Sequence, residues 1–147
     1  MAILDLTHVI PIKCEGSYPA LPGPLFPAPE VPPPSLAPTP LQLSVPHDMW
    51  IDMLPHGTMR DNAIRTMGTF DVDELCCDLV GGHYKGRNDL DLKGILAWSD
   101  PWCVSGWEVT EGFLKNWGFL LKGCWEILAA TNRWRGNRGD EPLVFEL

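Results

Sequence analysis

A short segment of the chain combines one carboxyl group with three indole rings, because Trp98, Trp102 and Trp107 surround Asp100. Burial among apolar rings disfavours an ionised carboxylate and raises its pKa. A protonated Asp100 could donate a hydrogen bond to a substrate carbonyl where charge develops. We therefore predict Asp100 as the catalytic residue and the three tryptophans as substrate-binding residues. In the alternative interpretation Asp100 caps the turn at Pro101 and the tryptophans fill a core.

The chain holds seven tryptophans in 147 residues, and apolar walls with a few placed polar groups are typical of ligand pockets. We add Trp50, Arg60 and Asn132 to the predicted substrate-binding residues. Arg60 could polarise a substrate carbonyl, or it could form a structural ion pair with Asp61 or with another element. Asn132 lies inside a predicted helix, where asparagine is disfavoured, which predicts an inward hydrogen bond.

Motifs for metals, nucleotides and nucleophilic catalysis are absent from the sequence. His47, His56 and His83 are isolated, and the Cys76-Cys77 pair has the wrong spacing to His83 for a structural zinc site. GxSxG, GxGxxG and GK[ST] do not occur. The cysteines number five and include no CxxC, which argues against a disulfide framework. We predict no metal and no cofactor.

The net charge of the chain limits the classes of partner that it is expected to bind. Lysine and arginine number 11 against 19 aspartates and glutamates, giving a net charge of −8. General nucleic-acid binding rests on an excess of basic residues, so it is not expected. The apolar runs are too short to span a bilayer, and the first residues lack the pattern of a secretory signal. We predict a cytoplasmic protein that binds neither nucleic acid nor membrane.

The prolines divide the chain. Twelve of the fifteen lie between Pro11 and Pro46, which predicts extended, polyproline-like backbone. Apolar residues alternate with these prolines, so we expect residues 1–46 to form an arm that wraps around the body. Pro19-x-x-Pro22 could instead be a ligand for an SH3-type domain. Residues 47–139 are predicted to form the helical domain and residues 140–147 a tail.

Apolar spacing predicts the helices. Short helices are expected from about 49 to 54, 58 to 67 and 72 to 80, the last with an acidic capping box at Asp71. The run 94–98 is either a strand or a buried helical turn. Ser105 and Glu108 match a second capping box, before a long helical pattern from Phe113 to Trp134. This is one helix or two collinear ones, weakened at glycines 118 and 123.

These elements predict a mainly α, small single-domain bundle around one long C-terminal helix, with the proline-rich arm wrapped on it. Several motifs, in their order, resemble a fungal domain of unknown function that commonly follows a basic-leucine-zipper region. They are His47-Asp48-Met49-Trp50-Ile51-Asp52, Met59-Arg60-Asp61-Asn62, Asp73-Glu74-Leu75-Cys76, Trp98-Ser99-Asp100-Pro101-Trp102, Ser105-Gly106-Trp107-Glu108 and Thr131-Asn132-Arg133-Trp134.

The resemblance covers residues 45 to 139. The region before His47 has no Lys/Arg-rich helix and no leucine heptads, so we expect the domain to stand alone, and DNA reading is not carried over. No catalytic residue is transferred from the family either.

Two functions follow from these observations. The first is a cofactor-free cyclase or isomerase of fungal secondary metabolism. One example is a pericyclase of the [4+2], Diels–Alder type, which folds an apolar substrate in an aromatic pocket. Its substrate would be a terpenoid or a polyketide intermediate. The alternative is a ligand-sensing or regulatory module related to zipper-type transcription factors, without catalysis. A third hypothesis is an interaction protein that uses the proline-rich arm. Homo-oligomerisation is left open.

Overall fold

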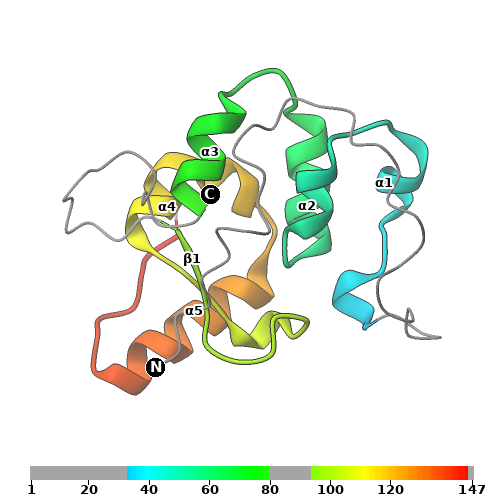
Figure 1. Ribbon diagram of the computed structural model, residues 1–147. Helices are drawn as coiled ribbons and strands as arrows, with labels where there is room; N and C mark the ends of the chain where they lie inside the picture. The colour runs from blue at the N-terminus through cyan, green and yellow to red at the C-terminus, as the bar shows by residue number, and fades with distance from the viewer. Residues whose placement is uncertain (1–32, 80–93, 146–147) are drawn as a thin grey trace.

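The computed structural model describes residues 33–79 and 94–145 (Figure 1). Its fold is mainly helical, as the sequence predicts, with one two-stranded sheet. In chain order the elements are the 3-10 helix η1 (Pro34–Leu36), α1 (Pro40–Ser44), η2 (Met49–Met53), α2 (Gly57–Arg65), α3 (Val72–Leu79), β1 (Ile95–Ala97), η4 (Val104–Gly106), β2 (Trp107–Val109), α4 (Glu111–Trp117), η5 (Gly118–Leu121) and α5 (Trp125–Arg138).

The arm is not extended throughout its described part, and here the prediction is wrong. Helix α1 begins after Thr39, whose hydroxyl accepts a hydrogen bond from the Gln42 backbone N–H at 3.2 Å. The Gln42 side chain in turn accepts from the Thr39 backbone N–H at 2.9 Å. Pro40 occupies the first helical position, where its missing N–H costs no hydrogen bond. Residues 1–32, with the Pro19-x-x-Pro22 motif, lie outside the described residues.

The predicted helix near 58–67 is confirmed as α2, which buries Met59, Ala63 and Ile64. The segment at 49–54 forms the 3-10 helix η2 instead of an α-helix, and Asp48 precedes it without a side-chain cap. Asp71 does cap α3, since its carboxylate accepts from the Glu74 N–H at 3.0 Å. The predicted end of that helix, residues 80–82, lies outside the described residues.

The run 94–98 forms a strand. Strand β1 pairs antiparallel with β2, with Leu96 opposite Glu108. The predicted capping role of Ser105 is wrong, because Ser105 lies in η4 and the residues after it continue into β2. Thr110 caps the following helix α4, and its hydroxyl accepts from the Phe113 N–H at 3.3 Å.

The predicted long helix is broken. Helix α4 ends at Trp117, η5 follows, and Gly123 has a φ of +77°, a left-handed value that favours glycine. Helix α5 then runs to Arg138 and ends at Gly139, which also has a left-handed φ of +80°. Figure 1 shows α4 and α5 as separate helices that are not collinear. No described helix is long and apolar enough to cross a membrane.

One hydrophobic core joins these elements. Helix α5 packs on β2 and η4, while α2 packs on η5, α1 and η2. The Thr131 hydroxyl of α5 accepts from the Val109 N–H of β2 at 2.9 Å, which aligns the helix with the hairpin. Among the described residues, the buried members of this core are Ile51, Leu54, Met59, Ala63, Ile64, Leu75, Val109, Phe113, Trp117, Leu120, Leu121, Cys124, Ile127 and Leu128.

Candidate functional site

The predicted aromatic site forms a stacked face between the hairpin and α5. The Trp98 ring stacks on Trp134, with centroids 5.9 Å apart and planes 25° apart. The guanidinium of Arg138 lies 5.1 Å from the Trp98 centroid, and that of Arg133 lies 5.9 Å from the Trp134 centroid. Trp98 therefore contacts two residues of α5, Trp134 by ring stacking and Arg138 by a cation–π interaction.

Glu108 is the polar centre of this stack, with only 2% of its surface exposed. Both its oxygens accept from Arg138, at 2.7 Å each, and Oε2 also accepts from the Trp98 indole N–H at 2.6 Å. Hydrogen bonding to Glu108 raises the pKa of Arg138. Arg138 also pairs with Asp140 at 3.0 Å. Sequence reasoning missed Glu108 as a partner of Arg138, because 30 residues separate them.

Asp100 is exposed, so the predicted buried carboxyl group is not found. Its backbone carbonyl accepts from the Cys103 N–H at 2.9 Å, which closes the turn over Pro101. The alternative role of Asp100 as a turn residue fits this geometry.

The two other tryptophans of the hairpin have different surroundings. The Trp107 indole N–H donates to the Pro101 carbonyl at 2.9 Å. Trp102 is 48% exposed, and its carbonyl accepts a hydrogen bond from the Ser35 hydroxyl. The hairpin tip thus contacts the arm, and its tryptophan side chains are partly exposed at the surface.

Arg60 is almost fully buried, with 1% of its surface exposed, and it joins the arm to α2. Its guanidinium donates to the Ser35, Ala37 and Leu54 carbonyls at 2.9–3.0 Å. It also donates to the Gln42 side-chain carbonyl at 2.9 Å. Burial lowers the pKa of Arg60.

The alternative ion pair between Arg60 and Asp61 does not form. Asp61 instead accepts from the Thr39 hydroxyl at 2.5 Å and pairs with Arg65 at 3.6 Å. The inward hydrogen bond predicted for Asn132 forms, because its amide donates to the Leu143 carbonyl at 3.1 Å and accepts from the Leu143 N–H at 2.8 Å. Asn132 therefore secures the segment that follows α5.

Trp50 belongs to a further cluster, in which its ring meets Phe70 edge-on at 6.3 Å. Its indole N–H is buried and has no hydrogen-bond partner within the described parts of the chain. The predicted substrate-binding residues thus fall into separate groups. The hairpin tryptophans lie together, whereas Arg60, Asn132 and Trp50 make their described contacts elsewhere.

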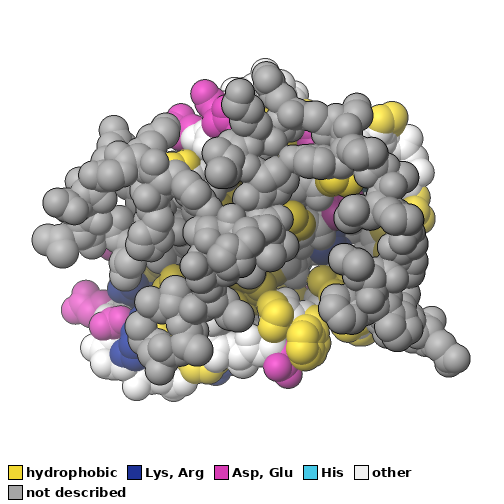
Figure 2. Space-filling model, in the orientation of Figure 1, with side chains coloured by type: hydrophobic (Ala, Val, Ile, Leu, Met, Phe, Trp, Pro, Cys, Tyr) yellow, Lys and Arg dark blue, Asp and Glu magenta, His cyan; other side chains and the backbone are white. Residues whose placement is uncertain are grey.

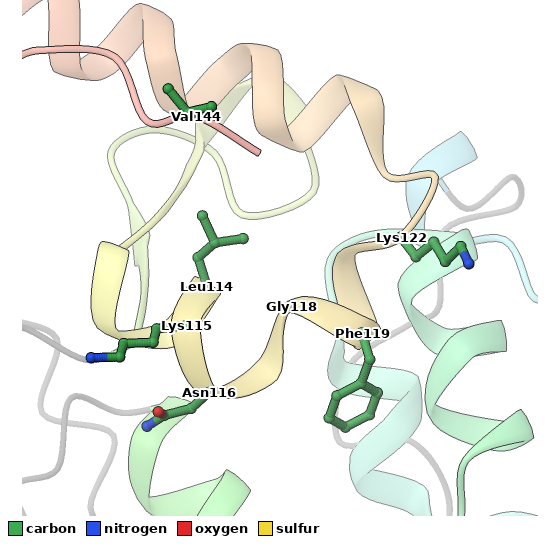
Figure 3. Close-up of a pocket in the computed structure, with 7 residues that line it drawn as sticks. All are labelled: Leu114, Lys115, Asn116, Gly118, Phe119, Lys122 and Val144. Atoms are coloured by element: carbon green, nitrogen blue, oxygen red, sulfur yellow. The ribbon is translucent and has the colours of Figure 1, made fainter. Parts of the chain in front are cut away.

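A surface depression of about 670 Å³ is lined by none of the predicted site residues (Figure 3). Leu114 and Phe119 give it apolar surface, and Figure 3 shows Leu114 pointing toward Val144 from the segment after α5. The described residues that line it are Leu114, Lys115, Asn116, Gly118, Phe119, Lys122 and Val144.

Charge at this depression is positive. Lys115 and Lys122 line it, and in Figure 3 their side chains extend outward in opposite directions; neither pairs with a described carboxylate. Asn116 is held in place because its amide donates to Asp78 at 3.1 Å, and the Trp117 indole donates to the same carboxylate oxygen at 3.0 Å. The available sequence signal was two lysines near apolar residues, Lys115 within α4 and Lys122 directly after η5, although the position of Val144 could not be foreseen.

The sequence model of a family described as a domain of unknown function, DUF3425, matches residues 29–128. The chain belongs to the DUF3425 family. The resemblance drawn from the ordered motifs is thereby confirmed. The DUF3425 match begins inside the predicted arm, in agreement with the contacts between Arg60 and residues 35–42. No curated protein and no solved structure matches the chain.

Proposed function

We propose that this domain is a ligand-sensing regulatory module that binds a small amphiphilic acid. The observation that carries the proposal is the depression of about 670 Å³ beside α4 and η5. Pockets for small organic ligands have volumes of about 300 to 1,000 Å³. The depression falls within that range and combines apolar and cationic side chains.

The lining has the chemistry of a binding surface. The Phe119 ring is 40% exposed, and Leu114 and Phe119 both line the depression, so both offer apolar surface to a ligand. Lys115 and Lys122 supply ammonium groups on long, flexible stems that can turn toward a bound anion. A carboxylate on an apolar body satisfies both kinds of group.

The cyclase hypothesis stays a prediction. It requires Asp100 to be shielded from water beside the three hairpin tryptophans, and Asp100 is exposed. Trp98 and Trp107 have their indole N–H groups bonded to Glu108 and to the Pro101 carbonyl. The observed geometry therefore favours the regulatory alternative over catalysis at this hairpin.

One experiment separates the two functions. The full chain is titrated with terpenoid and polyketide carboxylic acids and, in parallel, with their methyl esters, and each mixture is then analysed for products. Sensing predicts saturable binding of an acid, at least tenfold weaker binding of its ester, and unchanged ligand afterwards. Absence of saturable binding, or equal affinity for acid and ester, contradicts the proposal.

Formation of an isomeric product would also contradict a purely sensing role. Loss of that product in Asp100→Ala, with an unchanged melting temperature, would establish the cyclase instead. Trp125→Ala is the control variant for ligand binding, because Trp125 is exposed and does not line the depression.

A further inference from the structure

Three large apolar side chains are exposed where the arm meets η2. Leu43 is 76% exposed, Met49 65% and Met53 67%. We call these three residues the methionine patch. A single exposed apolar residue needs no explanation, but a group of neighbouring ones marks an interaction surface. Figure 2 shows hydrophobic side chains at several separate places on the face seen in this view.

Hydrogen bonds bring the two halves of the patch together. The Gln42 amide donates to the Asp52 carboxylate at 2.6 Å, which ties α1, the helix that carries Leu43, to η2, which carries Met49 and Met53. Met49 lies one 3-10 turn before Asp52 in the same helix. Helices α1 and η2 both pack on α2, which supports the patch from below.

The backbone beneath the patch is anchored. Ile51 is completely buried between the two exposed methionines. Arg60 donates to the Gln42 side chain from below, and His47 bonds to the Val45 carbonyl at 2.7 Å and to Asp52 at 3.0 Å. The methionine side chains are free to adapt to a partner while the backbone that carries them is held.

The charge around the patch is negative. Asp48 forms no ion pair with a described lysine or arginine, and Asp52 pairs with His47, a weak cation at neutral pH. Asp48 directly follows His47 in the chain and Asp52 bonds to the His47 ring at 3.0 Å, so both aspartates lie near His47. Arg60 is buried and bonded to carbonyl groups.

We propose that the methionine patch docks a basic amphipathic helix of a partner protein. Flexible, polarizable methionines suit apolar helix faces of varied shape. Lysines or arginines beside that face would approach Asp48 and Asp52, while an acidic partner would be repelled by these aspartates and by the chain's net charge of −8. This surface is separate in residues from the depression and goes beyond the proposed sensing function.

The test uses a labelled 14-residue leucine/lysine amphipathic peptide and the full chain. Fluorescence anisotropy gives the affinity, and a leucine/glutamate peptide of the same pattern is the probe for charge. The proposal predicts saturable binding of the lysine peptide and no detectable binding of the glutamate peptide. The double variant Met49→Ser/Met53→Ser should bind at least fivefold more weakly, with unchanged helical circular dichroism.

Two further variants locate the effect. Trp125→Ser removes an equally exposed apolar group outside the patch and should leave the affinity unchanged. Asp48→Asn should weaken binding at low salt and flatten its salt dependence. Equal affinities for the double variant and Trp125→Ser, or no binding of the lysine peptide to the wild-type chain, would overturn the proposal.

Discussion

Glu108 and Arg138 form a two-pronged ion pair that fastens the hairpin to the C-terminal end of α5. The two oxygen–nitrogen distances are 2.7 Å, and the carboxylate is buried while the arginine side chain is 36% exposed. Paired hydrogen bonds of this kind fix geometry as well as charge. The Trp98 indole bonds to the same carboxylate, so ring stack and ion pair form one unit.

Breaking this pair should destabilise the domain. Arg138→Met leaves the buried Glu108 carboxylate without its cation, and we expect a loss of about 3 kcal/mol in the free energy of unfolding. Urea denaturation measures this loss. Arg65→Met removes an exposed arginine paired at 3.6 Å and should change stability by less than about 1 kcal/mol. Equal losses in the two variants would show that the Glu108–Arg138 pair contributes little.

Arg60 should control the attachment of the arm. Arg60→Leu leaves the Ser35, Ala37 and Leu54 carbonyls without this donor, whereas the Gln42 side chain keeps its bond from the Thr39 N–H, and the change should cost about 3 kcal/mol. Arg60→Lys should restore only part of this loss, because an ammonium group cannot reproduce the planar fork. Hydrogen exchange should rise in α1 of Arg60→Leu before it rises in α5. Uniform acceleration in both helices would contradict a local role.

His56 should make the domain less stable in acid. Its Nδ1 accepts from the Thr58 N–H at 3.1 Å, which requires an unprotonated nitrogen, and burial lowers its pKa below 6.5. This contribution to stability is present above pH 6.5 and is lost as the pH falls through the folded-state pKa. In His56→Asn, which keeps a capping side chain, denaturation midpoints at pH 7.5 and 5.5 should differ less than in the wild type.

His47 should act in the opposite direction. Its hydrogen bonds to the Val45 carbonyl and to Asp52 raise its pKa above 6.5. The protonated form therefore stabilises the fold below pH 6.5, and this contribution is lost as the pH rises through the folded-state pKa. His47→Gln should lower the free energy of unfolding more at pH 5.5 than at pH 8. An equal loss at both pH values would show that the charge on His47 does not contribute to stability.

The elements that local sequence determines were predictable. Helix α2 follows from the spacing of Met59, Ala63 and Ile64, and the cap of α3 from Asp71. The break after η5 was visible as a weak point, but a helical pattern cannot reveal that Gly123 takes a left-handed φ. Ser105 carried a capping pattern that pairing of β2 with β1 overrode.

The sites were less predictable, because long-range contacts make them. Nothing near Arg60 in the sequence indicates that carbonyls of residues 35 and 37 are its partners. The depression needs Val144 to lie opposite Leu114 across 30 residues of chain. Asp100 stood beside tryptophans in the sequence, yet a turn turns its side chain to solvent.

The affinity of a long-chain fatty acid for the wild-type chain and for Phe119→Ala tests the central claim most directly. Calorimetric titration should show one site in the wild type and at least tenfold weaker binding in the variant, a difference of about 1.4 kcal/mol. The double variant Lys115→Ala/Lys122→Ala should weaken binding of the acid more than binding of its methyl ester. Binding that is unchanged in Phe119→Ala and in the lysine variant would contradict a ligand site in this depression.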